Sequence, residues 1–238
     1  MPKPLIALIL ASVALIALAA TTSPAKPVNS QVISSAAPNV VLVTDTLSIL
    51  PDKRDCVDHV AKLPKSNLYK RSDRRLGQRD LVVVLKSARR LMLFRRGKAV
   101  KNNKAKGCWQ VGLGGGKIAG TKHREGDMKT PEGWYRTSDK PWSKFHGAIA
   151  IHYPNRVDAR RGLRNGLITR RTYKRITRAL SRGLKPPQHT RLGGEVLIHG
   201  GGGGSDWTLG CVALDNHHLD ELRAALPKNK RIDVLILP

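Results

Sequence analysis

The most informative stretch of this sequence is Ile198-His-Gly-Gly-Gly-Gly-Gly-Ser-Asp-Trp-Thr-Leu-Gly-Cys-Val-Ala-Leu214. An apolar β-type run ends at His199, a glycine-rich loop follows, and Gly210-Cys211 occupies a tight turn before a predicted helix. Glycines let a backbone approach a substrate closely and supply unobstructed N–H groups. If the loop folds back, it brings the imidazole beside the thiol, so this stretch predicts a His–Cys pair.

The pair has the residue types that nucleophilic catalysis on a carbonyl requires. A free thiol has a pKa of about 8.5 and attacks as the thiolate, so Cys211 needs a base such as His199. The backbone N–H of Cys211, with that of Gly210 or a nearby residue, is the candidate donor to a tetrahedral oxyanion. Each element alone is weak evidence, because a lone cysteine is more often an inert buried residue.

A zinc site is a second interpretation of the same residues. His199 and Cys211, with His217 or His152, are acceptable zinc ligands. The sequence has no paired spacing of the Cys-x2-Cys or His-x3-His type. We therefore predict no metal and no other cofactor.

The rest of the chain predicts a mainly β architecture with mixed sheets and two attached helices. Apolar runs of β type predict strands at Leu81–Leu85, Arg90–Phe94, Ala148–His152, Glu195–His199 and Ile232–Leu237. A further strand, third in chain order, is expected to follow the turn 95–98 and to reach Val111. The first three strands are expected to form a β-meander. Upstream, we expect a short strand over 40–49, a short helix over 56–63 and a solvated basic loop over 71–79.

Both helices follow from apolar residues spaced three and four apart. The first is inserted between strands and runs from Leu167 to Leu184, where Pro186-Pro187 stop it. The second is capped by Asp215 and follows the cysteine. The cations on the opposite face of the inserted helix are Arg170, Arg171, Lys174, Arg175, Arg178 and Arg182. This face is either a solvated surface or a ridge that binds a polyanion.

The composition restricts the class of partner. The chain has 238 residues, 40% of them hydrophobic, and a formal net charge of +26. That apolar content excludes a disordered polycation, and the charge predicts an anionic partner: nucleic acid, an acidic membrane surface or an anionic wall polymer. Four Trp, four Tyr and two Phe are few for base stacking, and no nucleic-acid motif is present, so nucleic acid is the weakest of the three.

The N-terminus predicts export. Lys3 precedes an uncharged apolar run from Leu5 to Ala20 that ends in small residues, which predicts a signal peptide cleaved near Ala19 or Ala20, the alternative being an uncleaved anchor. In an oxidising compartment, two of the three cysteines commonly pair. Cys56 and Cys108 are the candidates for a disulfide, against the alternative of three independent thiols.

Four short motifs together resemble the L,D-transpeptidase catalytic domain family (YkuD type). The matching segments are His199-Gly200, Thr208-Leu-Gly-Cys-Val212, Gly126-Asp127 with Thr130-Pro-Glu-Gly-Trp-Tyr135, and Tyr153-Pro-Asn155 with Asp158. The resemblance covers roughly Leu81 to Pro238. Leu209 stands where the commonest family pattern has His, and the His-to-Cys interval is short, which resembles a divergent branch that includes a hydrolytic member.

The residues themselves predict a signal peptide over 1–20, a linker over 21–39 and an N-terminal extension over 40–79. The resemblance implies a β-rich catalytic domain over 80–238. It implies action on peptidoglycan stem peptides in the periplasm or cell wall. Cys211 would attack the carbonyl of the third stem residue, a diamino acid, and release the terminal D-alanine. His199 would act as base and then acid, and the carbonyl of Gly200 would orient it.

The acyl acceptor divides the enzymatic alternatives. An amine on another stem or on a wall-anchored protein makes the protein a transferase, whereas water makes it an L,D-carboxypeptidase or amidase-type hydrolase. A noncatalytic protein that binds anionic wall polymer through its basic surface is the third possibility. Further candidates for substrate contact are His152, Thr208 and Trp207, although a strand-end histidine such as His152 is more often satisfied by a backbone partner. Asp127, Thr130 and Glu132 are expected to form turns, and His217 and His218 to lie on the surface.

Overall fold

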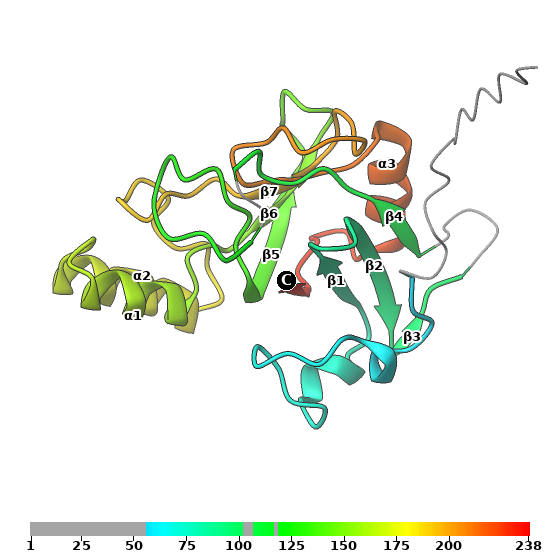
Figure 1. The fold of residues 1–238 in the computed structure, drawn as a ribbon, viewed down its shortest axis with the longest axis horizontal. Coiled ribbons are helices and arrows are strands. Elements are labelled where there is room, and N and C mark those ends of the chain that lie inside the picture. The colour runs from blue at the N-terminus through cyan, green and yellow to red at the C-terminus, as the bar shows by residue number, and fades with distance from the viewer. Residues whose placement is uncertain (1–55, 102–106, 117–118) are drawn as a thin grey trace, which may run out of the picture. The chain divides into compact units, whose positions relative to one another are not determined.

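The computed structural model describes residues 56–101, 107–116 and 119–238, which lie in one compact unit that spans Leu47–Pro238 (Figure 1). The predicted signal peptide, the linker and the expected strand over 40–49 lie outside the described residues. None of the helices in the described ranges combines the length and the apolar character needed to span a bilayer.

Within the described ranges the strands form one mixed sheet. They are β1 (Leu81–Leu85), β2 (Arg90–Arg95), β3 (Lys98–Ala99), β4 (Cys108–Gln110), β5 (Gly133–Lys140), β6 (Ala148–Ile151), β7 (Leu197–His199), β8 (Val212–Ala213) and β9 (Asp233–Leu237). Their order is β3-β2-β1-β9-β5-β6-β7-β8, and β4 also pairs with β2. The pairs β1–β9 and β7–β8 are parallel and the others antiparallel. The predicted mainly β fold with mixed pairing is confirmed.

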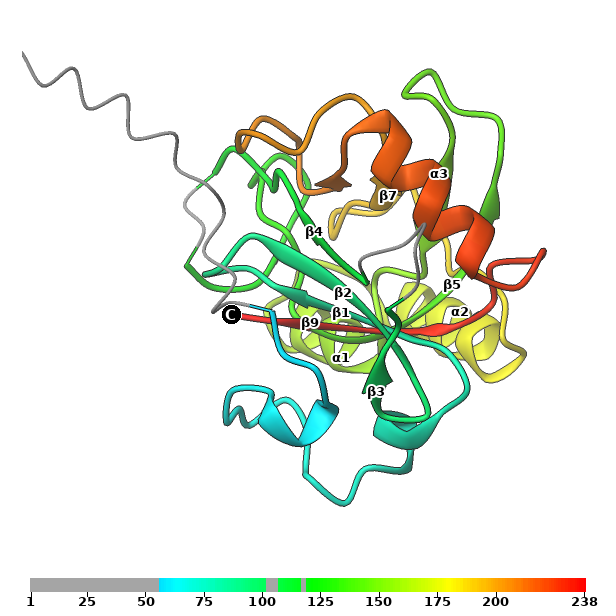
Figure 2. The ribbon, with the colours of Figure 1, turned by 90° about the vertical axis from the view of Figure 1, so that its right-hand side faces the viewer.

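The centre of the sheet is buried on both faces. All residues of β1 and β9 are buried, which explains why both strands are continuous apolar runs instead of alternating ones. Val82 and Val84 point into the main core, and Leu81 and Val83 point into a second core on the other face. Each such side chain contributes about 1.5–3 kcal/mol to stability through burial. Figure 2 shows the C-terminal strand β9 running through the middle of the fold.

Three α-helices accompany the sheet in the described residues, one more than the sequence predicts. They are α1 (Arg156–Arg164), α2 (Arg170–Ser181) and α3 (Asn216–Ala225). The expected inserted helix is α2, which is shorter than expected because Thr169 caps its first turn and its last turn closes at Arg182. The predicted helix after Asp215 is α3. Helix α1 starts at a capping box between Asn155 and Asp158 and has too few apolar residues for periodicity to reveal it.

Several strand predictions need correction. The expected third strand is two strands, β3 and β4, on either side of residues 102–106, which are not among the described residues. The expected β-meander is present as β1-β2-β3. The structure also contains β5 and β8, which were not predicted. The motif at Thr130–Tyr135 was interpreted as turn chemistry alone, but Gly133 adopts a φ of +123° and begins the longest strand, β5.

The N-terminal extension covers one face of the sheet. Leu63, Tyr69 and Leu76 pack with Val83 and Phe94 in the second core. The helix expected over 56–63 is only a 3-10 turn at Val60–Lys62, and the loop expected over 71–79 buries Leu76 within a second 3-10 turn at Arg74–Gly77. These segments are held by packing on the hydrophobic face of the sheet. Their own sequences have no regular apolar spacing that predicts this structure.

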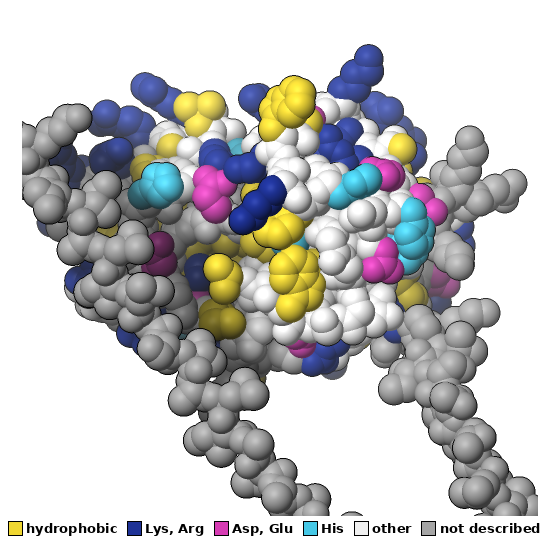
Figure 3. Space-filling view, turned by 90° about the horizontal axis from the view of Figure 1, so that it is seen from above, with side chains coloured by type: hydrophobic (Ala, Val, Ile, Leu, Met, Phe, Trp, Pro, Cys, Tyr) yellow, Lys and Arg dark blue, Asp and Glu magenta, His cyan; other side chains and the backbone are white. Residues whose placement is uncertain are grey.

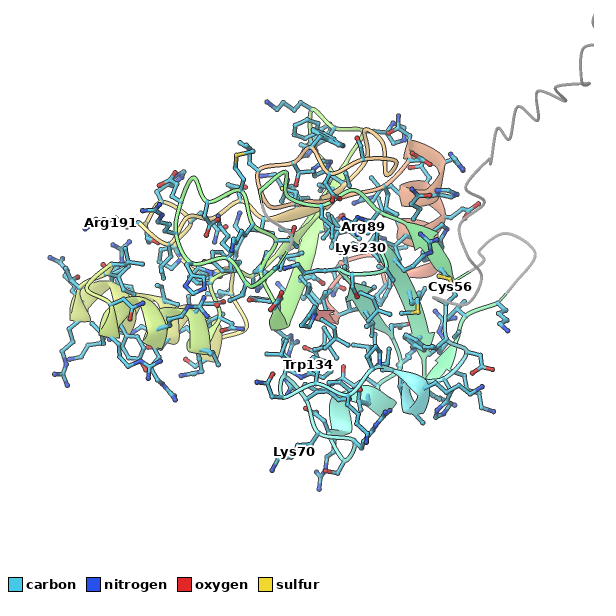
Figure 4. All side chains as sticks on the ribbon, in the orientation of Figure 1. Cys56, Lys70, Arg89, Trp134, Arg191 and Lys230 are labelled. Carbon is cyan, nitrogen blue, oxygen red and sulfur yellow. A yellow bond between two sulfur atoms is a disulfide. The ribbon has the colours of Figure 1, made fainter. Side chains whose placement is uncertain are left out.

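Two contacts attach the extension to the sheet. Cys56 forms a disulfide with Cys108 of β4, with the two Cα atoms 6.2 Å apart. The guanidinium of Arg75 lies 3.9 Å from the ring centre of Trp134 of β5, a cation–π contact. Figure 4 labels Cys56 and Trp134 at these two places. The described part of the extension, residues 56–79, is therefore part of the folded unit.

A buried ion pair holds the loop before β5. Lys86 is 1% exposed, and its ammonium group donates to Glu132 Oε1 at 2.7 Å and to the carbonyl oxygens of Gly120 and Thr130. Asp127 accepts hydrogen bonds from Lys122 Nζ and from the backbone N–H groups of the loop. Both acids have the structural roles that were expected of them.

We predict that Glu132→Ala lowers the free energy of unfolding by about 3–5 kcal/mol, because it leaves the Lys86 ammonium group buried without its counter-ion. The double variant Lys86→Met/Glu132→Ala should recover part of this loss. Chemical denaturation monitored by circular dichroism measures both. Asp58→Ala, which removes the exposed partner of Lys62, is the control and should leave the midpoint nearly unchanged. Equal midpoints for Glu132→Ala and Asp58→Ala would contradict the assignment.

Candidate active site

The short parallel ladder between β7 and β8 places His199 and Cys211 on one face of the sheet. Ile198 pairs with Val212 and His199 pairs with Ala213. Because side chains two residues apart on a strand share a face, His199 and Leu197 lie on the same face as Ala213 and Cys211. The glycine-rich loop folds back between them, with the Gly202 N–H donating to Leu214 O.

Small side chains form the floor beside the thiol. Ala148 and Ala150 of β6 pair with His199 and Leu197 of β7, and both alanines are buried in one cluster with Leu197, against which Cys211 packs. The two alanines are 0% and 3% exposed, so this floor lies beneath the surface beside the thiol. Figure 3 shows hydrophobic, His and cationic side chains interspersed on the upper face of the molecule.

The imidazole of His199 is held on one side by a backbone carbonyl and on others by aromatic rings. The side chain is 1% exposed, and Nδ1 lies 2.5 Å from the carbonyl oxygen of Gly200. Since a carbonyl oxygen only accepts, Nδ1 carries the proton and Nε2 is the basic nitrogen. The Phe145 ring stacks on the imidazole at 4.6 Å, and the Trp207 ring meets it edge-on at 5.6 Å. Burial lowers the pKa of His199, and the contact with Gly200 opposes this only in part, so the neutral form predominates at neutral pH.

The Cys211 thiol is also neutral at rest. Burial is the largest influence and raises the pKa of Cys211, while the Leu197 N–H, which donates to Sγ at 3.4 Å, lowers it by less. The thiol in turn donates to the carbonyl oxygen of Glu195 at 3.6 Å. Transfer of the proton to His199 therefore requires the thiol to leave the Glu195 carbonyl.

Two threonine hydroxyls support the turn that carries the nucleophile. Thr208 Oγ1 donates to the carbonyl oxygen of Cys211 at 2.9 Å and accepts from the Gly210 N–H at 3.1 Å. Thr130 Oγ1 donates to the same carbonyl at 3.4 Å and accepts from the Gly114 N–H. The turn needs a glycine at position 210, where φ is +123° and a Cβ would come within 2.6 Å of Lys129 O.

These contacts correct two site predictions. The Gly210 N–H is bonded to Thr208, so it is not placed as the expected oxyanion donor. Thr208 is 3% exposed and shapes the turn instead of facing a substrate. The contact predicted between the Gly200 carbonyl and the imidazole is present, and Trp207, 40% exposed, lies at the rim against His199 with its Nε1 donating to Gly202 O.

His152 is not brought to the His–Cys pair. It follows β6 on the same face as Ala148 but four residues away, about 13 Å along a strand. Its Nε2 lies 3.0 Å from Ser138 Oγ, and burial lowers its pKa to about 4. Its side chain lines a separate cavity of about 750 Å³ with Trp134 and Arg136. The partner of His152 is therefore the side chain of Ser138 and not the backbone group that was expected.

Other site residues were not found from the sequence. Phe145 stacks on His199 and lies in the loop between β5 and β6, where Trp142 is 89% exposed. Two aromatic residues in a polar loop were the available signal, because loops often carry binding groups. His217 and His218 lie at the start of α3, as expected. In the part of the chain that the structure describes, no group of three or more His, Cys, Asp or Glu side chains is arranged to hold a metal ion.

Comparison with known proteins places the chain in a family. The family model for the L,D-transpeptidase catalytic domain (YkuD) matches residues 79–234. The chain therefore belongs to the L,D-transpeptidase catalytic domain family, whose members act on peptidoglycan.

The individual relatives are distant. The putative L,D-transpeptidase YafK of Escherichia coli K12 is 29% identical over 106 residues, which cover 43% of this chain and 30% of YafK. Among solved structures, Pgp2 of Campylobacter jejuni, described as a helical cell shape determining protein, is 22% identical with a TM-score of 0.44 over 66% of this chain and 46% of that chain. Bd1075 of Bdellovibrio bacteriovorus is 21% identical with a TM-score of 0.41 over 74% of this chain and 53% of that chain. This chain thus spans about half or less of the length of these relatives.

We predict that iodoacetamide modifies Cys211 alone in the unreduced folded protein, because the other two cysteines form the disulfide. The rate should rise with pH through a midpoint above that of an exposed thiol, since burial raises the pKa of Cys211. Intact-mass measurement across a pH series gives the profile. The unfolded, unreduced protein is the control and should react faster at pH 7.5. A midpoint equal to or below that of the unfolded protein, or three modified cysteines without reduction, would contradict this assignment.

Proposed function

We propose that this protein is a peptidoglycan-modifying cysteine acyltransferase that forms a thioester between Cys211 and a stem peptide. The observation that carries the proposal is the arrangement of His199. Its Nδ1 is held by the Gly200 carbonyl, and its basic Nε2 belongs to a ring on the same sheet face as the Cys211 thiol. This is the pairing of nucleophile, base and orienting group that covalent acyl transfer uses.

The first half-reaction forms the thioester. Sγ of Cys211 attacks the carbonyl carbon of the diamino acid at the third stem position, and its proton passes to Nε2 of His199. The C–N bond to the terminal D-alanine then breaks, and the proton on His199 passes to the leaving amine. The Cys211 N–H is our candidate donor to the oxyanion, because the Gly210 N–H is already bonded within the turn.

The second half-reaction resolves the thioester. An amine of another stem, or of a wall-anchored protein, attacks the thioester carbonyl and passes a proton to His199. The C–S bond breaks, and the thiolate recovers its proton from the imidazolium. Water in place of the amine would make the product a trimmed stem, as in an L,D-carboxypeptidase.

The test is incubation with purified disaccharide-tetrapeptides and identification of the products by mass spectrometry. We expect cross-linked dimers with loss of D-alanine. Cys211→Ala should abolish them, and His199→Ala should slow their formation by about 100-fold or more, since general acid–base catalysis contributes 10²–10⁴. His217→Ala, which changes an exposed imidazole at the start of α3, is the matched control and should retain activity.

Each other result has a definite meaning. Trimmed tripeptides without dimers would replace the transferase proposal with the hydrolase alternative. Turnover retained by Cys211→Ala would contradict cysteine catalysis altogether. Wall binding without any turnover by the wild-type protein would favour the noncatalytic alternative.

The basic surface supports a second proposal, retention of the protein on anionic wall polymer. Between Arg156 and Gly194 the only acidic residue is Asp158, which is buried and paired with Arg161. The cations of α2 are exposed along its length, and Figure 1 shows α1 and α2 as a pair set to one side of the sheet. Such a face binds carboxylates or phosphodiesters of a polyanion. This proposal places the protein outside the cytoplasm, where the predicted signal peptide would direct it.

We predict that the triple variant Arg171→Glu/Arg175→Glu/Arg178→Glu loses salt-sensitive binding to isolated cell walls in a sedimentation assay. Turnover of small soluble stems should persist, because none of the three residues lies at the thiol. The matched control is Lys62→Glu/Lys65→Glu/Lys70→Glu, which makes the same charge change on exposed lysines of the N-terminal extension. Equal binding losses in both triple variants would show that net charge, and not this face, is responsible. Tighter binding to RNA or DNA than to wall polymer would overturn the assignment of the partner.

A further inference from the structure

A cavity between the N-terminal extension and the sheet takes no part in the proposed acyl transfer. Its volume is about 750 Å³, which is within the range of small-molecule sites, about 300–1,000 Å³. Leu68 and Gln78 line it from the extension, and Trp134 and His152 line it from the sheet. His152 is about 13 Å along the strand direction from the alanine floor beside the thiol. The cavity is therefore separate from the candidate active site.

Two side chains that line the cavity have buried nitrogen atoms without a hydrogen-bond partner among the described residues. The atoms are Trp134 Nε1 and His152 Nδ1. An indole N–H can only donate. The imidazole is 3% exposed, and its Nε2 lies 3.0 Å from Ser138 Oγ. Because a hydroxyl can donate as well as accept, Ser138 can donate to Nε2 and leave the proton on Nδ1. The cavity thus offers two N–H donors to a ligand that supplies acceptors.

The charges at the cavity favour a ligand with one negative charge. The cations and carboxylates that line it are paired with one exception, and the pairs are Lys86–Glu132, Arg136–Asp233 and Arg75–Asp73. The exception is Arg156, the first residue of α1. Among the described residues its guanidinium contacts only the carbonyl oxygen of Thr177, at 3.4 Å. Arg156 therefore leaves one positive charge without a counter-charge, and a guanidinium binds the oxygens of carboxylates and phosphates well.

Apolar side chains make up another part of the lining. They are Leu68 of the extension, Val157 of α1 and Leu180 of α2. Val157 is 65% exposed, so an apolar group bound against it would remove apolar surface from water, which is favourable. An inorganic ion would use the N–H donors and the cation and leave these side chains uncovered. The lining therefore fits an organic anion with an apolar body.

We propose that this cavity is a binding site for an organic monoanion, in which a carboxylate or phosphodiester group is attached to an apolar body. The N–H groups of Trp134 and His152 donate to the anionic oxygens, and Arg156 supplies the opposite charge. One wall of the cavity belongs to the N-terminal extension and the other to β5 and α1, so a bound ligand also fastens the extension to the sheet. The site does not involve Cys211 and is independent of the proposed function.

The experiment follows the indole N–H resonances of the isotope-labelled full chain by NMR during titration at constant ionic strength. The probes are hexanoate, dibutyl phosphate and the neutral hexanamide, and Trp134→Phe identifies the Trp134 resonance. We expect at least one of the anions to shift this resonance saturably, because the N–H gains an acceptor. The tighter anion identifies the preferred oxyanion group. Hexanamide should bind at least about tenfold more weakly, the effect of losing one charge-assisted hydrogen bond. The resonance of Trp109, whose Nε1 donates to Glu221 at 2.9 Å, should not move.

Arg156→Met should raise the dissociation constant of the anion at least about tenfold, because it removes the unpaired cation. The matched control is Arg160→Met, an exposed arginine one turn further along α1, which should leave the constant unchanged. The indole spectrum of each variant establishes that it is folded. The absence of a saturable shift with both anions, equal affinity for hexanamide, or equal effects of the two variants would overturn the site. None of these results bears on Cys211, so the proposed acyl transfer stands or falls separately.

Discussion

Two residue pairs of parallel ladder, Ile198 with Val212 and His199 with Ala213, determine where the base and the nucleophile lie. Parallel neighbours ordinarily need a crossover of a dozen or more residues that contains a helix. In this protein a glycine-rich loop makes the connection. Its glycines are required by close packing: a Cβ at Gly203 would come within 2.7 Å of Gln110 O, and one at Gly200 within 2.5 Å of Asn216 Oδ1. The loop is thereby fixed on the rest of the fold, which holds the imidazole in place.

Burial, and not the large positive charge, controls the chemistry of the pair. It lowers the pKa of His199 and raises that of Cys211, so both groups rest in their neutral forms. A neutral pair avoids the cost of holding two charges in an apolar site. The exposed cations of α2 lie on a separate helix pair, so the proposed wall binding and the proposed acyl transfer can be tested by separate variants.

The sequence predicts those parts of the structure whose signal is local. The buried runs of β1, β2 and β9 are continuous apolar stretches, and the spacing of three and four in α2 is visible without any tertiary information. The strand β5 was missed because its motif contains Pro131 and Gly133, which local rules assign to a turn, whereas pairing with β6 and β9 makes it the longest strand.

The residues of the candidate site also fall into those that the local sequence predicts and those that it does not. His199, Cys211 and the Gly200 carbonyl are near one another in sequence, so their relationship follows from the motif. The hydroxyl of Thr130 reaches Cys211 across 81 positions, and Lys140 reaches Glu195 across 55. Contacts of such separation depend on the register of the whole sheet, which one sequence does not reveal. The role expected of Gly210 failed for a related reason, since the partner of its N–H is decided by the side-chain rotamer of Thr208.

The central claim is that Cys211 carries the acyl group during turnover. The most direct measurement is acid quenching of wild-type protein during reaction with a tetrapeptide stem, followed by peptide mapping of the covalent adduct. The account predicts a tripeptide attached through a thioester to the peptide that contains Cys211, removed by hydroxylamine. An adduct on a different residue, or turnover that proceeds without any covalent adduct, would contradict it.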